Sequence, residues 1–180
     1  MENSTKSPVR AFFALWPNEA ERAALSAWQP QLKKLCGGRA TPDDRLHTTL
    51  VFLGEVEAER VEALKLAAQE LSGAAFSLLF DTAKYWGQNH IVCAAPGSVP
   101  PMLAQLVNAL ERVLLRHHFK IDRREYKPHV TLLRHAHCRN SSLPEMPPVV
   151  WSMHDFVLVQ SVSEGQGVRY EVLERFPLAE

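Results

Sequence analysis

One order of strand, helix and strand occurs twice in this sequence, and this repeat strongly limits the folds that the chain can adopt. The first copy, over residues 11–53, consists of AFFALWP, a helical segment and LHTTLVFL. The second, over residues 90–135, consists of HIVCAAP, a helical segment and PHVTLLRH. The spacing predicts two pseudo-symmetric halves that place His47 and His129 at equivalent positions, facing each other across a shared cleft.

Hydrophobic periodicity and capping residues predict the elements of the two halves. Asn18, followed three positions later by Glu21, starts a helix that should break near Pro30. Further helices are expected over residues 61–72 and 100–119, strands over 9–15, 76–80 and 90–94, and a closing hairpin over 154–162 and 167–176.

Composition limits the partners and the compartment that we expect. With 180 residues, 46% of them apolar, the chain can bury a sizeable core, and we predict one domain over residues 1–180. Lys and Arg balance Asp and Glu at 20 each, so no overall field would hold bulk nucleic acid or an anionic membrane. The sequence shows no signal-like or membrane-spanning apolar stretch. We therefore expect a cytoplasmic protein, and a monomer.

The three cysteines, Cys36, Cys93 and Cys138, are far apart and lack C-x-x-C spacing. An odd and widely spaced set indicates neither a disulfide framework nor a thiolate metal site. We expect all three to be reduced thiols.

Two H-x-T motifs stand at equivalent points of the repeat, HTTL and HVTL. Because alternate residues of a strand face the same side, His47 and Thr49 share one face, whereas Phe52 takes the other. His129 and Thr131 repeat this arrangement. A single H-x-T is more often an ordinary histidine beside a good strand former. Two copies at matched points favour a functional pair.

The chemistry of a cyclic phosphate explains why two histidines are useful. When water opens a 2′,3′-cyclic phosphate, the water must lose a proton and the departing ribose oxygen must gain one. An imidazole titrates near neutral pH, so two of them can act as base and acid, and no metal is required. Threonine hydroxyls can donate hydrogen bonds to the non-bridging oxygens. Pseudo-symmetry leaves open which histidine is the acid.

HTTL and HVTL about 80 residues apart, an N-terminal FFAL strand and PHVTLLR resemble the 2H phosphoesterase superfamily. Within it, the chain is similar to the bacterial RNA 2′,3′-cyclic phosphodiesterases, also called LigT-like 2′-5′ RNA ligases. The resemblance implies an α+β, bilobal fold with a pseudo-two-fold axis, in which two antiparallel β-sheets line a central cleft and helices pack outside.

The same resemblance implies an enzyme without cofactor or metal that acts on RNA or oligonucleotide ends carrying a 2′,3′-cyclic phosphate. His47 would be the proton donor and His129 the proton acceptor, so that the product is a 2′-phosphomonoester. Thr49 and Thr131 would hold the phosphate. The reverse reaction, attack of a 5′-hydroxyl on the cyclic phosphate, would explain the ligase name.

Arg134 is a further candidate for binding the substrate. In the resembling family an arginine here lies near the substrate phosphates. Strict alternation, however, places Arg134 on the face opposite His129, so that only a twist or a strand end would bring it into the cleft.

Arg124 and Phe13 are the other candidates. Arg124, with Arg123 and Lys127, could bind RNA phosphates beyond the cleavage site, or these side chains could form a solvated loop. Phe13 could stack on a base, as could Tyr85 and Trp86. For each of these aromatic residues, core packing is the alternative.

The other histidines are interpreted as structural, with one pair considered for a metal. His135 and His137 form an H-x-H pattern that could bind a metal, but we expect no carboxylate or cysteine to complete the ligand set. The histidines that we interpret as structural are His90, His117, His118 and His154.

Three function classes remain open at this point. The first is a metal-independent RNA-end phosphodiesterase, with a small cyclic-phosphate nucleotide or 2′-5′ oligoadenylate as the alternative substrate. The second is a nucleotide- or RNA-binding module without turnover, which the intact His and Thr pairs argue against. The third is a metal-dependent hydrolase, which a chelator would reveal.

Overall fold

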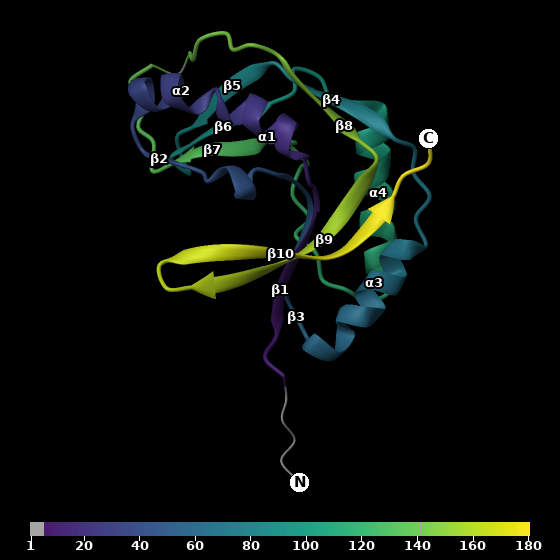
Figure 1. Ribbon diagram of the computed structural model, residues 1–180. Coiled ribbons are helices and arrows are strands. Elements are labelled where there is room, and N and C mark those ends of the chain that lie inside the picture. Colours follow the sequence, from purple (N-terminus) through teal and green to yellow (C-terminus); the bar gives the residue numbers. More distant parts are fainter. Residues whose placement is uncertain (1–5, 141) are drawn as a thin grey trace.

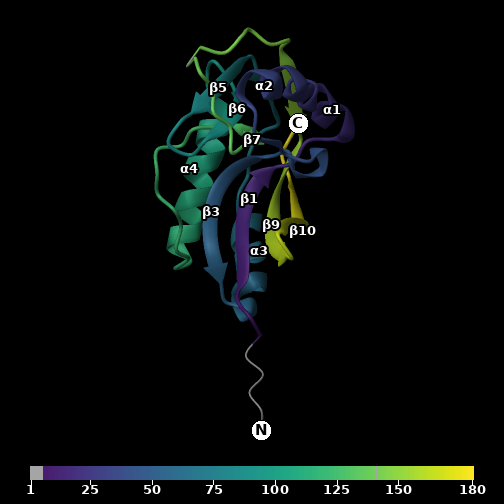
Figure 2. The ribbon, with the colours of Figure 1, turned by 90° about the vertical axis from the view of Figure 1, so that its left-hand side faces the viewer.

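The structure is a computed structural model that describes residues 6–140 and 142–180. Strands β1 (Val9–Leu15), β3 (Thr48–Val56), β9 (Asp155–Glu164) and β10 (Gly167–Pro177) form an antiparallel sheet in the order β10–β9–β1–β3. Strands β2 (Arg39–Ala40), β5 (Thr82–Trp86), β6 (Ile91–Ala95) and β7 (Val130–Arg134) form a second, in the order β2–β7–β6–β5. Strands β4 (Phe76–Phe80) and β8 (Val149–Met153) pair with each other. Figures 1 and 2 show these sheets from two sides.

Within the described residues, four α-helices and two short 3₁₀ turns connect the strands. Asn18 caps the first helix and exchanges hydrogen bonds with Glu21, which confirms the predicted capping box. The predicted break is confirmed too, since the second helix starts one residue before Pro30. The helices are α1 (Glu19–Ser26), α2 (Gln29–Cys36), α3 (Val61–Gln69) and α4 (Pro101–Arg116), with η1 at Asp43–Arg45 and η2 at Ala58–Arg60.

The two predicted halves have the same strand pairing. β1 pairs with β3 so that Ala14 lies opposite Thr49, and β6 pairs with β7 so that Cys93 lies opposite Thr131. In both pairs the register then skips one residue, and the skipped residue is the leucine of the motif, Leu50 or Leu132. The same β-bulge therefore follows each H-x-T.

The correspondence extends to the neighbouring strands. β4 leads into β5, which lies beside β6, and β8 leads into β9, which lies beside β1. Strand β5 was not among the expected elements, because its sequence TAKYW has only half-buried and exposed positions and little apolar periodicity.

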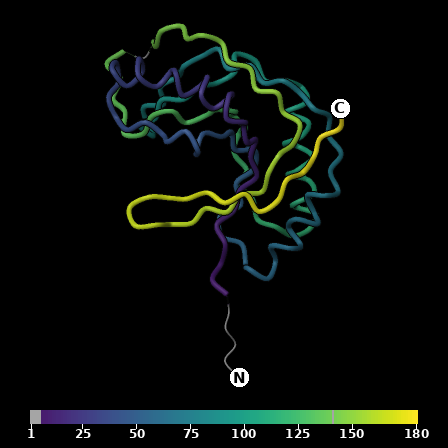
Figure 3. The backbone as a smooth tube through the Cα atoms, in the orientation of Figure 1, coloured from purple at the N-terminus to yellow at the C-terminus, as the bar shows by residue number. Residues whose placement is uncertain are grey.

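The two halves are interleaved along the chain. After α2, strand β2 pairs with β7 of the second sheet before the chain returns to β3 of the first. Gly38, just before β2, lies so close to this sheet that a Cβ there would be 2.5 Å from the Arg134 carbonyl oxygen. The smooth tube in Figure 3 lets the reader follow this crossing and the long β9–β10 hairpin.

One continuous cluster of buried side chains joins the sheets and the helices. Phe13, Trp28, Phe80 and Trp151 are among its largest fully buried members. In Figure 1, α3 and α4 lie together on the side of the molecule away from the tip of the β9–β10 hairpin. In the described part of the chain, none of the helices is both long and apolar enough to span a membrane.

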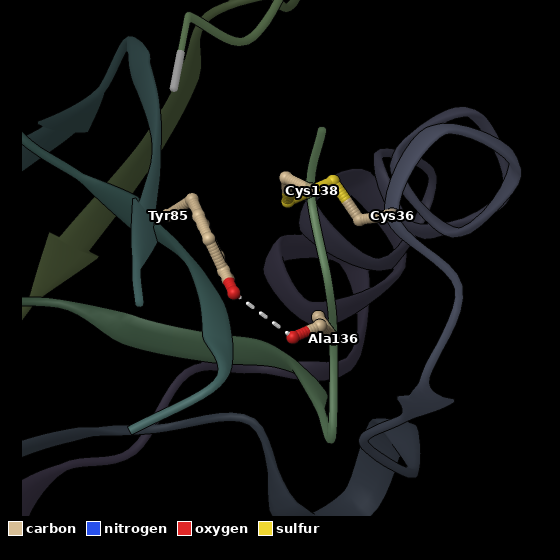
Figure 4. The surroundings of a disulfide bond; sticks show 4 residues. All are labelled: Cys36, Tyr85, Ala136 and Cys138. Carbon is tan, nitrogen blue, oxygen red and sulfur yellow. Dashed lines mark hydrogen bonds between the residues drawn. A yellow bond between two sulfur atoms is a disulfide. The ribbon is translucent and has the colours of Figure 1, made fainter. Parts of the chain in front are cut away.

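The prediction of three reduced thiols is wrong for two of them. Cys36, at the end of α2, and Cys138, after β7, form a disulfide although 102 positions separate them in the sequence (Figure 4). The β2–β7 pairing brings these two segments together, and sequence spacing reveals only cysteines that are close in the chain. Cys93 stays a free thiol, and burial raises its pKa to about 12.

Candidate active site

A cavity of about 710 Å³ lies between the two large sheets and receives both H-x-T motifs. His47 and Thr49 come from the start of β3, and His129 and Thr131 come from the start of β7. Each histidine lies one residue before its strand. The tip of the β9–β10 hairpin forms a further wall, and Figure 1 shows that hairpin opposite the β2–β7 edge.

His47 is held by a backbone hydrogen bond and surrounded by aromatic rings. Its Nδ1 donates to the Arg45 carbonyl oxygen at 2.7 Å, and its Nε2 lies 3.2 Å from the Thr49 hydroxyl. The ring stacks on Trp16, with centroids 5.4 Å apart and planes inclined by 21°. Phe12 lies on it at 5.1 Å, and Tyr170 meets it edge-on at 5.3 Å. The ring is therefore fixed in one orientation.

His129 has the same backbone contact in a more open environment. Its Nδ1 donates to the Lys127 carbonyl oxygen at 2.8 Å, so both histidines bond the carbonyl two positions earlier. Because a carbonyl oxygen only accepts, each Nδ1 carries a hydrogen, and each Nε2 is left for chemistry. Trp86 packs against the His129 ring with centroids 4.4 Å apart.

Both imidazoles have a lowered pKa. The pKa of His47 is lowered to about 4, mainly by burial and to a smaller extent by the charges of His129 and Arg134, against the raising effect of the hydrogen bond to the Arg45 carbonyl. Burial also lowers the pKa of His129, assisted by the charge of Arg134. Both rings are therefore neutral at pH 7 in the absence of an anion.

Arg134 lines the cavity together with the two motifs, on the side of β7 that carries His129 and Thr131. The bulge at Leu132 shifts the alternation by one, so Arg134 faces the same side as His129, contrary to strict alternation. The matching bulge at Leu50 does the same for Phe52, which lines the cavity rather than facing the core as predicted.

Comparison with known proteins decides the family. A family model for LigT-like phosphoesterases matches twice, over residues 15–93 and 94–170. The RNA 2′,3′-cyclic phosphodiesterase of Escherichia coli K12 is 33% identical over 96% of this chain and 98% of its own length. The enzyme of the same name from Thermus thermophilus is 32% identical over 94% of this chain and 90% of its own.

The structures agree with the sequences. The crystal structure of E. coli LigT complexed with 3′-AMP covers 96% of this chain and 99% of its own, with a TM-score of 0.82 and 32% identity. The chain belongs to the LigT-like phosphoesterase family. The α+β fold with antiparallel sheets is thereby confirmed, and the family model matches each half of this phosphoesterase separately.

Phe13 does not contact the cavity of this phosphoesterase, so its assignment as a substrate-binding residue is wrong. Its side chain is fully buried and packs against Phe156 and Phe176 in the core. Its neighbour Phe12, also in β1, lines the cavity and meets His47. The register of β1 against β3 decides between two adjacent phenylalanines, and the sequence FF does not contain that information.

Arg124 lies outside the phosphoesterase cavity and lines a second one beside it. It is exposed and forms a salt bridge with Asp122 at 3.0 Å. Trp86 lines that second cavity as well. Tyr85 is half-buried and donates a hydrogen bond to the Ala136 carbonyl oxygen, which Figure 4 shows.

Sequence analysis missed most of the positive charge in the cavity. Among the described residues that line it, none is Asp or Glu, and four are arginines. Only Arg134 is near a motif, and the others come from β1, β2 and η1, where no sequence signal marks them. They are Arg10, Arg39 and Arg45.

Tyr126 links the two motifs of the phosphoesterase. It precedes His129 by three positions and donates its hydroxyl to the Thr49 backbone carbonyl at 3.2 Å. Burial raises the pKa of this hydroxyl, so it remains a donor. The same loop thus positions the second histidine and holds the strand of the first motif.

The H-x-H pattern at His135 and His137 does not extend to a ligand cluster. His135 lines the cavity, whereas His137 packs on His90 with ring centroids 4.5 Å apart. Within residues 6–140 and 142–180, no group of three His, Cys, Asp or Glu side chains is arranged to hold a metal ion.

Proposed function

We propose that this phosphoesterase hydrolyses RNA ends that carry a 2′,3′-cyclic phosphate to 2′-phosphomonoesters. His47 acts as the general acid and His129 as the general base. The observation that carries the proposal is the pair of imidazoles with Nδ1 bonded to the backbone and Nε2 available, in one cavity lined by arginines. Since one chain supplies both, the proposal needs no second copy and treats the whole chain as one domain.

The tautomers suit the proposed proton transfers. With Nδ1–H donated to Lys127, the neutral His129 ring has a lone pair on Nε2 that can take a proton from the attacking water. His47 must enter the reaction protonated, although burial lowers its pKa in the free protein. An anionic phosphate next to the ring favours the charged form, so substrate binding itself raises the pKa of His47.

Arginines and hydroxyls would stabilise the phosphoryl oxygens. Arg134 lines the same cavity as both histidines, so its guanidinium can pair with a phosphate bound between them. Thr49 and Thr131 line the same cavity from the two sides. Hydrogen bonds aimed at developing charge in such a site lower the barrier of the chemical step.

RNA is the favoured substrate because the cavity can hold more than one phosphate and a base. Its remaining arginines extend along β1 and β2 beyond the motifs, and Phe52 presents an aromatic ring beside Thr49. The relatives from E. coli and T. thermophilus are named for this activity. A small cyclic-phosphate nucleotide would use the motifs, whereas Arg10, whose guanidinium lies 5.0 Å from the centroid of the Phe52 ring, offers a contact for a further phosphate.

The test is incubation with a short RNA ending in a 2′,3′-cyclic phosphate, followed by chromatography against 2′- and 3′-phosphate standards. The proposal predicts the 2′-phosphate, at an unchanged rate in excess EDTA. A 3′-phosphate product would show that O2′ is the leaving group and would contradict the proposed direction of ring opening. Loss of activity in EDTA that zinc or manganese restores would contradict the metal-independent route.

A further inference from the structure

Trp16 connects the first histidine to a cation outside the catalytic cavity. Its ring stacks on His47 with centroids 5.4 Å apart and planes inclined by 21°. The guanidinium carbon of Arg22 lies over the same indole, 5.3 Å from the ring centroid, which is the geometry of a cation–π contact. Arg22 lines neither of the two cavities. It therefore acts on His47 through the indole and through its charge, without contact to a bound substrate.

The first turn of α1 fixes the position from which Arg22 extends. The side chain of Glu21, one residue earlier, accepts hydrogen bonds from the backbone N–H groups of Asn18 at 2.9 Å and Ser152 at 2.7 Å. The Glu21 carbonyl oxygen accepts a third from the indole N–H of Trp151 at 3.4 Å. The capping box and β8 thus hold the backbone of Arg22 in place before its side chain meets Trp16.

The guanidinium of Arg22 is half-buried and only partly satisfied. Within the described part of the chain, its Nε and Nη2 are buried without a hydrogen-bond partner. Burial is the main cause that lowers its pKa, the charges of Asp44 and Asp43 raise it, and that of Arg175 lowers it. Buried donors without partners cost stability, and such groups in native proteins are often explained by function. The contact with Trp16 is therefore the feature that needs a functional account.

The second half of the molecule has a tryptophan at its histidine and no such cation. Trp86 packs on His129 with centroids 4.4 Å apart. Among the described residues, no Lys or Arg lies over the Trp86 ring, whereas Arg22 lies over Trp16. The cation is thus specific to the side of the general acid.

A positive charge near His47 disfavours a second charge on its ring. Burial is the main cause of the lowered pKa of His47, and three neighbouring cationic groups act in the same direction. The titratable or charged groups around the ring are His129, Arg134, Arg22 and Tyr170. Once a bound phosphate has favoured the imidazolium, the charge of Arg22 opposes it and so favours transfer of the proton to the leaving oxygen.

We propose that Arg22 is a positioning residue for the general acid. Its guanidinium holds the indole of Trp16 against the ring of His47, and its charge makes the proton on that ring easier to transfer. The inference rests on the proposed function. In the chemical step the bond from phosphorus to O3′ breaks, and the proton passes from Nε2 of His47 to O3′. Arg22 itself neither gains nor loses a proton.

The first test is an NMR titration of the two histidines in the free protein. Arg22→Met keeps an apolar stem on the indole and removes the charge, so the pKa of His47 should rise, whereas Arg22→Lys should keep it close to the parent value. The pKa of His129 should not change. Lys34→Met is the matched control, because it removes one charge from the exposed end of α2, and it should affect neither histidine. A parent-like His47 titration in a folded Arg22→Met protein would overturn the proposal.

The second test is the hydrolysis of a short RNA that ends in a 2′,3′-cyclic phosphate, with each protein at its own pH optimum. Arg22→Met should lower kcat roughly 3- to 30-fold, as expected for the loss of a cation–π contact. KM should stay within about twofold, because Arg22 lines neither cavity. Arg22→Lys should recover most of the lost kcat, and Lys34→Met should match the parent protein. A loss confined to KM, or an equal loss of kcat in Arg22→Met and Arg22→Lys, would contradict the proposal.

A double-mutant cycle with Trp16→Leu tests the route through the indole. When Trp16 is already leucine, Arg22→Met should lower kcat by roughly threefold or less, a smaller factor than in the parent protein, because the group through which Arg22 acts is gone. Equal factors in both backgrounds would overturn the proposal. The NMR titration needs no turnover, so its failure counts against this inference alone. A parent protein that does not hydrolyse the cyclic phosphate would instead overturn the proposed function.

Discussion

The two histidines occupy equivalent positions of the repeat and have different surroundings. His47 lies among Phe12, Trp16 and Tyr170 and bonds the hydroxyl of Thr49. His129 contacts one aromatic ring, that of Trp86, and opens to two cavities. The motif and its bulge are thus repeated, and the surroundings are not. The enclosed histidine suits an acid that gains its proton when an anionic phosphate binds beside it, and the open one suits a base that must be reached by a nucleophile.

The largest effect should come from removing either histidine. His47→Ala and His129→Ala should each lower kcat by roughly 10²- to 10⁴-fold, the usual contribution of a positioned acid or base. The double variant should lose much less than the product of the two losses, since the groups act together. Leu50 and Leu132 are buried on the other side of the strands, so the variants should stay folded, which circular dichroism would check. A folded His47→Ala protein with nearly the parent rate would refute paired catalysis.

The threonines should show a smaller and unequal effect. Thr49→Ala and Thr131→Ala should each lower kcat roughly tenfold to a hundredfold, because each removes a hydrogen bond to the phosphoryl oxygens. Thr49 also contacts Nε2 of His47, so its loss should alter the titration of that ring, measured by NMR, and the loss of Thr131 should leave it unchanged. Identical His47 titration curves in both variants would contradict the expectation that Thr49, and not Thr131, affects the His47 ring.

The pH dependence of kcat/KM should be bell-shaped, because one imidazole must be charged and the other neutral. Both histidines have a lowered pKa in the free protein, His47 to about 4. The maximum should therefore fall below the ordinary imidazole pKa of about 6.5. Initial rates at low substrate concentration across pH 4 to 9 would measure it. A monotonic rise with pH is incompatible with the acid and base pair.

Two tryptophan variants compare the surroundings directly. Trp16→Leu exposes the His47 ring and should raise the pKa of His47 from about 4 toward its ordinary value. Trp86→Leu should instead raise the pKa of His129, since burial is the main cause of its lowering. Either change should cost roughly tenfold or less in kcat, because each tryptophan acts by positioning. NMR titration of the two rings is the measurement, and a shift of the wrong ring would contradict the assignment.

The smallest effect concerns stability. Between pH of about 6.5 and about 4, the unfolded chain binds a proton at position 47 that the folded protein does not. The free energy of unfolding should therefore fall as pH decreases through this window. Above the window, the contribution of the neutral His47 to stability is fully present. Urea unfolding of the parent protein and of His47→Asn at pH 7 and pH 5 would compare the slopes. The variant should lose less stability on acidification, and equal losses would show that His47 is not desolvated.

The elements that sequence analysis predicted correctly depend on local signals. The capping box at Asn18, the break at Pro30 and the amphipathic helix α4 each follow from residues within a few positions of one another. The paired H-x-T motifs are also local, and their repetition at matched spacing indicated one shared site. The family resemblance adds the roles of the two histidines, which symmetric motifs leave open.

The sequence by itself determined the repeat, the two motifs and the type of chemistry that they favour, because strand alternation and hydrophobic periodicity act over a few residues. Only the tertiary structure decided which side chains surround the motifs. Two bulges turned Phe52 and Arg134 toward the cavity, and strand register turned Phe12 toward the cavity and Phe13 into the core. Contacts between distant segments also paired Cys36 with Cys138. Register and long-range contact depend on how whole sheets pack, and no short stretch of sequence contains that information.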